Sequence, residues 1–273
     1  MRHLAARRRS PLALLVVLLL GLAMTGTAYA ALQPKAEPGT SVATASTDEI
    51  AAGRQLFLAN CAFCHGTNAQ GAAPEAPEAQ AGPSLVGVGA AAVDFQVATG
   101  RMPLAAPGVQ APANRDSVLL SQEEITALAA YVDSLGPGPD VPAQEWIDLE
   151  GADIANGGAL FRTNCAMCHS SSGAGGALTR GKYAPGLMNV EPQHIYEAMV
   201  TGPQSMPVFN DANLSPEDKE DVIAFVKDIE NGGNSYGGHA LGALGPAGDA
   251  MFIWTFGIAL LIASAVWLGR KAR

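Results

Sequence analysis

Two short runs of the sequence combine a pair of thiols with an imidazole. The run 61–65 reads Cys-Ala-Phe-Cys-His, and the run 165–169 reads Cys-Ala-Met-Cys-His. In such a run both thiols can form thioether bonds to the vinyl groups of a porphyrin, and the adjacent imidazole can reach the iron. The sequence therefore predicts two covalently bound haems c. The predicted attachment residues are Cys61, Cys64, Cys165 and Cys168, and the predicted iron ligands are His65 and His169.

Three other uses of cysteine pairs fit this sequence less well. Two such pairs can hold a structural zinc ion, but they are usually about 15–20 residues apart and need no His after the second Cys. A thioredoxin-like redox pair needs a strand–helix–strand setting, which the sequence lacks. A disulfide across two residues is strained and adds little stability. Haem attachment is therefore the expected chemistry of both runs.

A methionine follows each run at the same distance and could supply the second iron ligand. Met102 and Met206 each lie 37 residues after the His of their own run, and each precedes a Pro. A lone Met is more often a core residue, but the equal intervals favour a shared role as axial ligand. Ligation by His and Met raises the reduction potential of a haem. Iron with six ligands has no open position for a substrate, so we expect electron transfer and no substrate-converting site.

The other sulfur and imidazole side chains are not expected to bind iron. Met167 lies inside its own run, and Met188 and Met199 lie too close to that run to match the interval in the first copy. His194 and His239 have no counterparts in the first copy. We interpret His194 as a surface or packing residue and His239 as a linker residue.

The sequence around the two runs is an internal repeat. Residues 51–57 resemble residues 155–161, at the offset of 104 that also separates the two Cys runs. Because no segment alternates convincingly between apolar and polar residues, we predict an all-α fold with much loop. Each copy has the order helix, Cys run, loops, Met-Pro, helix. Since the Gly-Pro-rich stretch 136–142 cannot be helical, we predict a linker at 137–150. The predicted domains are 48–136 and 151–230.

The opening and closing helices of each copy carry matched signals. A Gly and a Phe lie one helical turn apart in 53–57 and again in 157–161, which would let the closing helix approach the opening one. We expect Tyr131 and Phe225 to pack from the closing helices onto these faces. The predicted residues at the starts of the closing helices are the N-caps Ser121 and Ser215, the capping-box residue Glu124 and the N1 residue Pro216.

Both ends of the chain carry membrane-targeting or membrane-spanning signals. Residues 1–31 combine four arginines (Arg2 and Arg7 to Arg9) with an apolar run and an Ala-Tyr-Ala ending, which is typical of a signal peptide; read as uncleaved, they form an anchor. Residues 251–268 contain eighteen uncharged residues, enough for a transmembrane helix, and a basic tail follows at 269–273. This pattern predicts a cytoplasmic C-terminus. A tether at 32–47 and a Gly-rich linker at 231–250 would connect these segments to the domains.

Charge is distributed unevenly along the chain. All 25 acidic residues lie between positions 31 and 250, where only 9 Lys or Arg occur, so the predicted external part has a formal charge of -16. Such a surface would attract basic partners and repel nucleic acid. A solvated acidic face that maintains solubility would have the same composition. The charge pattern excludes nucleic-acid binding more firmly than it identifies a partner.

Each copy resembles a class I cytochrome c domain. The resemblance rests on the Gly-x-x-x-Phe helix, the Cys-x-x-Cys-His run, a Gly-Pro-x-Leu loop, the Met-Pro loop and an aromatic closing helix. It implies that Pro83 and Pro185 pack beside the proximal His and accept its N–H with their carbonyls. The second copy departs from this pattern, because Ala184 stands where Gly is usual.

The whole chain resembles the dihaem cytochrome c subunit of actinobacterial cytochrome bc complexes, which oxidise quinol. The resemblance implies a cytochrome b subunit, a Rieske iron–sulfur subunit and a haem-copper oxidase as partners at the cell membrane. Electrons would pass from the iron–sulfur centre through both haems, on the external side, to the oxidase. Two alternatives stay open: a dihaem subunit of a cytochrome oxidase or periplasmic dehydrogenase, and a dihaem peroxidase.

Overall fold

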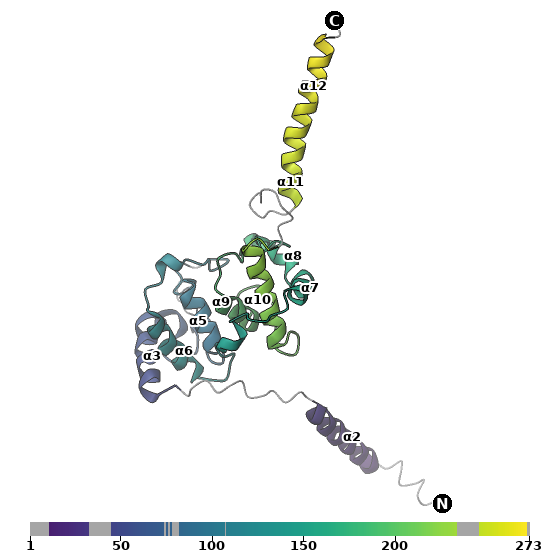
Figure 1. The fold of residues 1–273 in the computed structure, drawn as a ribbon. Helices are drawn as coiled ribbons and strands as arrows, with labels where there is room; N and C mark the ends of the chain where they lie inside the picture. The colour runs from purple at the N-terminus through teal and green to yellow at the C-terminus, as the bar shows by residue number, and fades with distance from the viewer. Residues whose placement is uncertain are drawn as a thin grey trace, which may run out of the picture. The chain divides into compact units, whose positions relative to one another are not determined.

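The computed structural model of the 273-residue chain describes residues 11–32, 45–73, 75, 77, 82–106, 108–233 and 246–271. The chain divides into two units, Met1–Thr44 and Ala45–Arg273. The described part of the first unit is the 22-residue helix α2 (Pro11–Leu32) (Figure 1). Predictions about the arginines of residues 1–10, most of the tether, His239 and Arg273 fall outside the described residues.

Two groups of helices make up the core of the second unit, as Figure 1 shows, with α3, α5 and α6 in one group and α7, α9 and α10 in the other. We refer to them as the first and second modules. The first module contains α3 (Thr47–Asn60), α4 (Ala62–His65), α5 (Ala90–Ala98), the 3-10 helix η2 (Arg115–Ser117) and α6 (Gln122–Asp133). The second contains the 3-10 helix η3 (Gln144–Trp146), α7 (Ile154–Asn164), α8 (Ala166–His169), β1 (Gly176–Ala177), the 3-10 helix η4 (Thr179–Gly181), β2 (Tyr183–Ala184), α9 (Pro192–Thr201) and α10 (Pro216–Glu230).

Two features of this architecture differ from the sequence-based expectation. Helices α5 and α9 occupy segments that were expected to be loops. α5 is apolar on several sides and shows no clear amphipathic stripe, whereas α9 does show one, over only ten residues. The second module also contains one antiparallel strand pair, in which Gly176 faces Ala184 and Ala177 faces Tyr183. Strands of two residues are too short to show a period of two in sequence.

The predicted caps of the closing helices are confirmed. The Ser121 hydroxyl accepts from the Glu124 backbone N–H at 3.3 Å, and the Glu124 carboxylate accepts from the Ser121 N–H at 2.8 Å. Ser215 forms the same capping box with Asp218, and Pro216 stands at N1. These reciprocal bonds satisfy backbone donors that a helix start leaves without partners.

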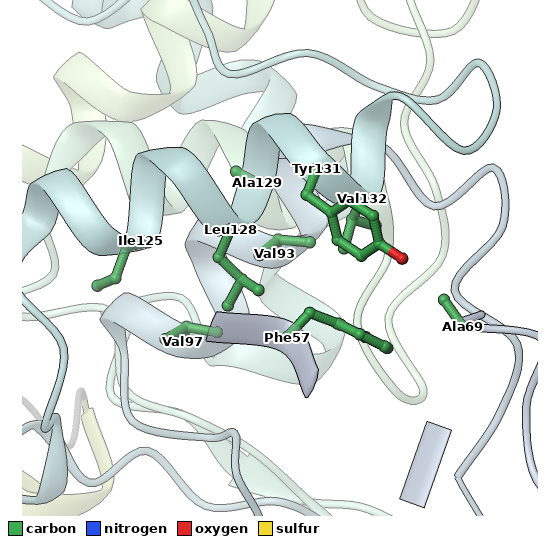
Figure 2. Packing of buried hydrophobic residues seen from close by; sticks show 9 residues of the cluster. All are labelled: Phe57, Ala69, Val93, Val97, Ile125, Leu128, Ala129, Tyr131 and Val132. Atoms are coloured by element: carbon green, nitrogen blue, oxygen red, sulfur yellow. The ribbon is translucent and has the colours of Figure 1, made fainter. Parts of the chain in front are cut away.

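The predicted close packing of opening and closing helices is also confirmed in both modules. A Cβ added to Gly53 would lie 1.9 Å from the Ala127 carbonyl oxygen, so only glycine allows α3 and α6 to lie this close. The Phe57 and Tyr131 rings are 5.3 Å apart at 51°, and Figure 2 shows them turned toward each other with Leu128 beside them. In the second module the corresponding rings of Phe161 and Phe225 are 5.4 Å apart at 49°.

The C-terminal helix has the length and composition of a membrane span. It comprises α11 (Pro246–Phe252), a π-helical turn at Ile253–Gly257 and α12 (Ile258–Lys271). The stretch Ala250–Lys271 meets both criteria, with a mean hydropathy of 2.1, and it includes the predicted span. Its large apolar side chains are exposed, Trp254 by 68%. A helix that is apolar on all sides and covered by no other element fits a lipid environment.

Candidate haem-binding sites

Each Cys run continues from the opening helix through one tight turn with the same backbone hydrogen bonds. The Cys61 N–H donates to the Phe57 carbonyl at 2.8 Å, and the N–H groups of Cys64 and His65 donate back to the Cys61 carbonyl at 3.1 and 3.0 Å. The second run repeats these bonds at 2.8, 3.1 and 2.9 Å. Both runs therefore hold two thiols and an imidazole on one helical turn.

A proline carbonyl orients the imidazole in each module. His65 Nδ1 lies 2.7 Å from the Pro83 carbonyl oxygen, and His169 Nδ1 lies 2.9 Å from that of Pro185. Because a carbonyl only accepts, Nδ1 must carry the proton and Nε2 keeps its lone pair for a metal. Such a bond to the distal nitrogen is typical of metal-binding histidines. Burial also lowers the pKa of His169, against a smaller opposing effect of the Pro185 bond, which favours the neutral imidazole that iron requires.

Burial also acts on the first thiol of each Cys run. Burial, with a smaller contribution from Cys64, raises the pKa of Cys61 to about 11. Burial and Cys168 raise the pKa of Cys165 to about 11 in the same way. Before any covalent bond forms, these thiols therefore stay protonated near neutral pH, and their thiolate reactivity is low.

The second module surrounds a cavity of about 520 Å³ with its predicted site residues. Cys165, Cys168, His169 and Met206 all line this cavity, whose other walls are mainly apolar. Its volume falls within the range of cofactor pockets, about 300–1,000 Å³. The cavity, the attachment thiols and the free Nε2 together fit a covalently attached porphyrin.

The first module brings part of its predicted site together around its core. Cys61 and Met102 both pack against the buried cluster that contains Phe57 and Tyr131. Met102 is half-buried and precedes Pro103 through a cis peptide bond. The assignment of Met102 and Met206 as axial ligands stays a prediction.

The first module also supplies part of the wall of the second cavity, which the sequence interpretation missed. Arg101, Gln110 and Arg115 line it together with residues of the second module. Gln110 exchanges two hydrogen bonds with the backbone of Tyr183, at 2.7 and 2.9 Å, and Arg115 donates to the Asn189 carbonyl at 2.8 Å. One sequence feature could have indicated this shared wall. The residue before the predicted Met ligand is Arg101 in the first copy but Ser205 in the second, so the copies differ at this position.

His194 lies at the boundary between the modules, which agrees with its interpretation as a packing residue. Its ring makes an edge-on contact with Phe95 of the first module, with 6.5 Å between centroids, and it also lines the second cavity. Among the other methionines, Met167 is 92% exposed and Met199 is buried in the second core. The structure therefore places neither of them in the Met-Pro loop position.

Comparison with protein families identifies both modules. Residues 50–136 match the family model described as cytochrome c, and residues 152–226 match the model described as cytochrome C oxidase, cbb3-type, subunit III. Cytochrome c6 of Parathermosynechococcus lividus is 37% identical over 81 residues, which is 28% of this chain. These matches are of the length of one module. The chain therefore contains two cytochrome c domains, which with their two Cys runs carry two covalently bound haems c.

Relatives that match nearly the whole chain are named cytochrome bc1 complex cytochrome c subunit. The protein of Mycobacterium tuberculosis is 43% identical over 263 residues, covering 94% of this chain and 90% of that protein. The protein of Corynebacterium efficiens is 41% identical over 274 residues, covering 94% and 88%. That of Corynebacterium diphtheriae is 42% identical over 252 residues, covering 86% of each. With this similarity extending over both haem modules and beyond them, the chain belongs to the family of cytochrome c subunits of the cytochrome bc1 complex.

Proposed function

We propose that this chain receives electrons from the Rieske iron–sulfur subunit of a quinol-oxidising bc complex and delivers them to a haem-copper oxidase. In this role it serves a quinol–cytochrome c reductase without a substrate-converting site of its own. The observation that carries the proposal is that the two haem modules together form the wall of one haem cavity. The second cavity is walled partly by the first module, through Gln110 and Arg115. Two haems held in one structural unit are suited to electron transfer within a complex.

The proposed iron ligands are His65 with Met102 and His169 with Met206. A haem bound in this way supplies one-electron chemistry at a raised potential. The carbonyls of Pro83 and Pro185 would hold the two imidazoles in a fixed orientation, with Nε2 turned away from the hydrogen bond. The apolar walls of the second cavity limit the access of water to the metal.

The proposed location of the haem modules is the external face of the cell membrane. The span Ala250–Lys271 would anchor the chain, and Arg270 and Lys271 at its end favour a cytoplasmic C-terminus. Helix α2, 22 residues without a charge, would then enter the membrane as a signal or second anchor. The excess of acidic residues between the two apolar segments would favour basic surfaces on the partners.

Isolation of the tagged chain in mild detergent tests this proposal. We expect cytochrome b, the Rieske protein and a haem-copper oxidase to copurify. We also expect the isolated assembly to oxidise quinol and to reduce oxygen. If oxidase is absent but cytochrome b and the Rieske protein are present, the delivery step is wrong. If the chain is recovered alone, and quinol oxidation persists in cells that lack it, the whole proposal is wrong.

The main alternative is a dihaem subunit of a cytochrome oxidase. One observation favours it, because the second module matches a family model named for an oxidase subunit. That match covers only residues 152–226, whereas the bc1 relatives reported above cover 86–94% of the chain. The same purification separates the two proposals, since an oxidase subunit would copurify with oxidase and without cytochrome b.

A further inference from the structure

Helices α5 and α9, one from each module, contact each other and enclose three ionisable side chains. Asp94 on α5 is 3% exposed, and Glu197 on α9 is fully buried. The side chain of His194, also on α9, is 13% exposed. One potential ligand atom from each of the three lies within 4.8 Å of the other two. These residues have no part in either haem site as predicted from the sequence.

This cluster has two buried carboxylates and no strong cation beside them. Among the described residues, no Lys or Arg forms an ion pair with Asp94 or Glu197, and the nearest basic group is His194 Nε2, 3.7 Å from Asp94 Oδ1. Removing an unpaired carboxylate from water costs several kcal/mol, so buried carboxylates are normally paired or bind metals. The cluster therefore requires a positive charge or a proton.

Two atoms of the cluster also lack any hydrogen-bond partner within the described part of the chain. They are Glu197 Oε2 and His194 Nδ1, both inaccessible to solvent. A buried polar atom without a partner is uncommon in proteins, and such atoms often lie next to a bound ion or an ordered water. Glu197 Oε2 thus offers an open ligand position beside the excess negative charge, and the unpartnered His194 Nδ1 lies on the ring whose Nε2 faces Asp94.

Two glutamines orient the carboxylates while leaving those positions open. The Gln193 amide donates to Asp94 Oδ1 at 3.1 Å and to Glu197 Oε1 at 2.9 Å. The Gln122 amide donates to Asp94 Oδ2 at 3.0 Å. A carboxylate has about four lone-pair directions, so each retains acceptor capacity. Hydrogen bonds of this kind from a surrounding layer hold metal-binding carboxylates in place.

A pocket at the boundary between the modules reaches His194 of the cluster. This pocket of about 240 Å³ is lined by Arg115 and Gln122 from the first module and by Glu191 and His194 from the second. A water molecule occupies about 30 Å³ in the liquid. The pocket is therefore large enough for a hydrated ion to approach His194.

We propose that Asp94, His194 and Glu197 bind one divalent metal ion, for which Zn²⁺ is the best match, and that this ion joins the two haem modules. One imidazole nitrogen with two carboxylate oxygens suits zinc, whereas calcium and magnesium prefer oxygen ligands alone. Three protein ligands leave a fourth position for water. Two carboxylates and a divalent ion form a neutral group, which removes the cost of the buried charge.

The required movement is small. Zinc–oxygen and zinc–nitrogen bonds of about 2.0–2.2 Å place neighbouring ligand atoms of a tetrahedral ion roughly 3.3–3.6 Å apart. Asp94 Oδ1 and His194 Nε2 are already 3.7 Å apart. The widest separation, within 4.8 Å, would close by about 1 Å through rotation of a side chain. Since His194 also lines the second haem cavity, the ion would steady that wall as well.

A proton is the competing occupant. Without a metal ion, burial and the neighbouring Asp94 raise the pKa of Glu197 to about 9, so that a proton on Glu197 would remove its negative charge. A metal count distinguishes the two occupants, because the ion adds a metal atom to the protein and the proton does not.

The test is a metal count on the full-length chain, purified with its haems in detergent, incubated with Zn²⁺ and then desalted. Its two haem irons provide an internal standard, and we expect about one zinc for every two irons by mass spectrometry of the elements. Glu197→Gln and His194→Gln should each reduce bound zinc to a small fraction of this value. Glu150→Gln removes an exposed carboxylate between the modules and should leave the ratio unchanged.

Two further measurements keep the result decisive if a ligand variant folds poorly. Gln193→Ala retains all three ligands and should weaken zinc binding about 10–100-fold. A chelator should lower the melting temperature of the wild-type chain, and zinc should restore it. Wild-type protein that holds no stoichiometric zinc, or well-folded ligand variants that retain it, would overturn the proposal. The zinc count does not involve the respiratory partners, so its failure is separate from failure of the proposed electron route.

Discussion

Two adjacent glycines in α7 allow the packing of the second module to be tested by a single added methyl group. A Cβ at Gly157 would lie 1.9 Å from the Asp221 carbonyl oxygen and 3.0 Å from the Val222 nitrogen, both in the backbone of α10. A Cβ at Gly158 would instead meet the Phe225 ring, at 2.9 Å. Contacts below 3.0 Å force one group to move. The Gly157→Ala variant must separate two helices, whereas Gly158→Ala only displaces a ring.

The magnitudes follow from two opposing effects. Overpacking a core typically costs about 1–3 kcal/mol, and the contact with a backbone carbonyl places Gly157→Ala at the upper end. Replacing a helical Gly with Ala also stabilises the helix by about 1 kcal/mol in both variants, because Ala has the higher helix propensity. We therefore expect Gly157→Ala to lower the free energy of unfolding by about 2 kcal/mol and Gly158→Ala by less than about 1 kcal/mol.

Denaturant unfolding of the haem-loaded chain, followed by haem absorbance, measures both changes. Because the two variants share the helix and the propensity gain, their difference reflects the group that the added methyl contacts, backbone carbonyl or aromatic ring. Equal stabilities, or a larger loss in Gly158→Ala, would show that α7 and α10 are not held together by this close backbone contact.

Three other changes probe the sites and caps. Met206→Leu should lower the reduction potential of one haem and remove the weak far-red band of Met-ligated ferric haem, measured by spectroelectrochemistry; retention of both would exclude Met206 as a ligand. Arg101→Gln removes a cation from the wall of the second cavity and should lower the potential of one haem, since positive charge favours the reduced form; an unchanged potential would place the guanidinium too far away. Ser215→Ala breaks the capping box of α10 and should cost about 1 kcal/mol in denaturant unfolding, whereas Ser215→Asp, which can still cap, should restore most of it.

The elements repeated between the two copies were predictable from sequence because each depends on local chemistry. The Cys runs, the capping serines and the Gly-x-x-x-Phe faces require particular residues at fixed spacings, and the structure confirms the caps and faces. The proline carbonyls follow from family resemblance, and both lie within hydrogen-bond distance of their His. Repetition made each signal stronger than it would be alone.

Helices α5 and α9 were harder to predict because their environments override local signals. α5 begins after Gly89 with no side-chain cap, and α9 begins at Pro192 with none. Both modules bury these helices against other elements, so apolar residues lie on more than one face. In α5 a periodic stripe is then absent, so that segment resembles a loop in sequence. α9 does show the helical period, but over only ten residues and without a side-chain cap.

The contact between the modules was not predictable from the repeat, because it is formed by residues that differ between the copies. Matching Thr99 with Thr201, whose hydroxyls donate to the equivalent carbonyls of Phe95 and Glu197, aligns α5 with α9. In that alignment Val97 is paired with Met199, and both side chains are apolar and buried. The positions of the three-residue cluster do not agree: Asp94 is paired with the core residue Tyr196, Glu197 with Phe95, and His194 with Ala92.

This division has a physical basis. Positions that face a module's own core are constrained in the same way in both copies, so they keep similar residues. Positions that face the other module meet different surroundings in each copy, so an ion-binding or hydrogen-bonding pair must place unlike residues on the two sides. Arg101, where the second copy has Ser205, follows the same rule at the second haem cavity. In a tandem protein of this kind, the departures from the repeat therefore mark where the copies meet, and Asp94, His194 and Glu197 are three of them.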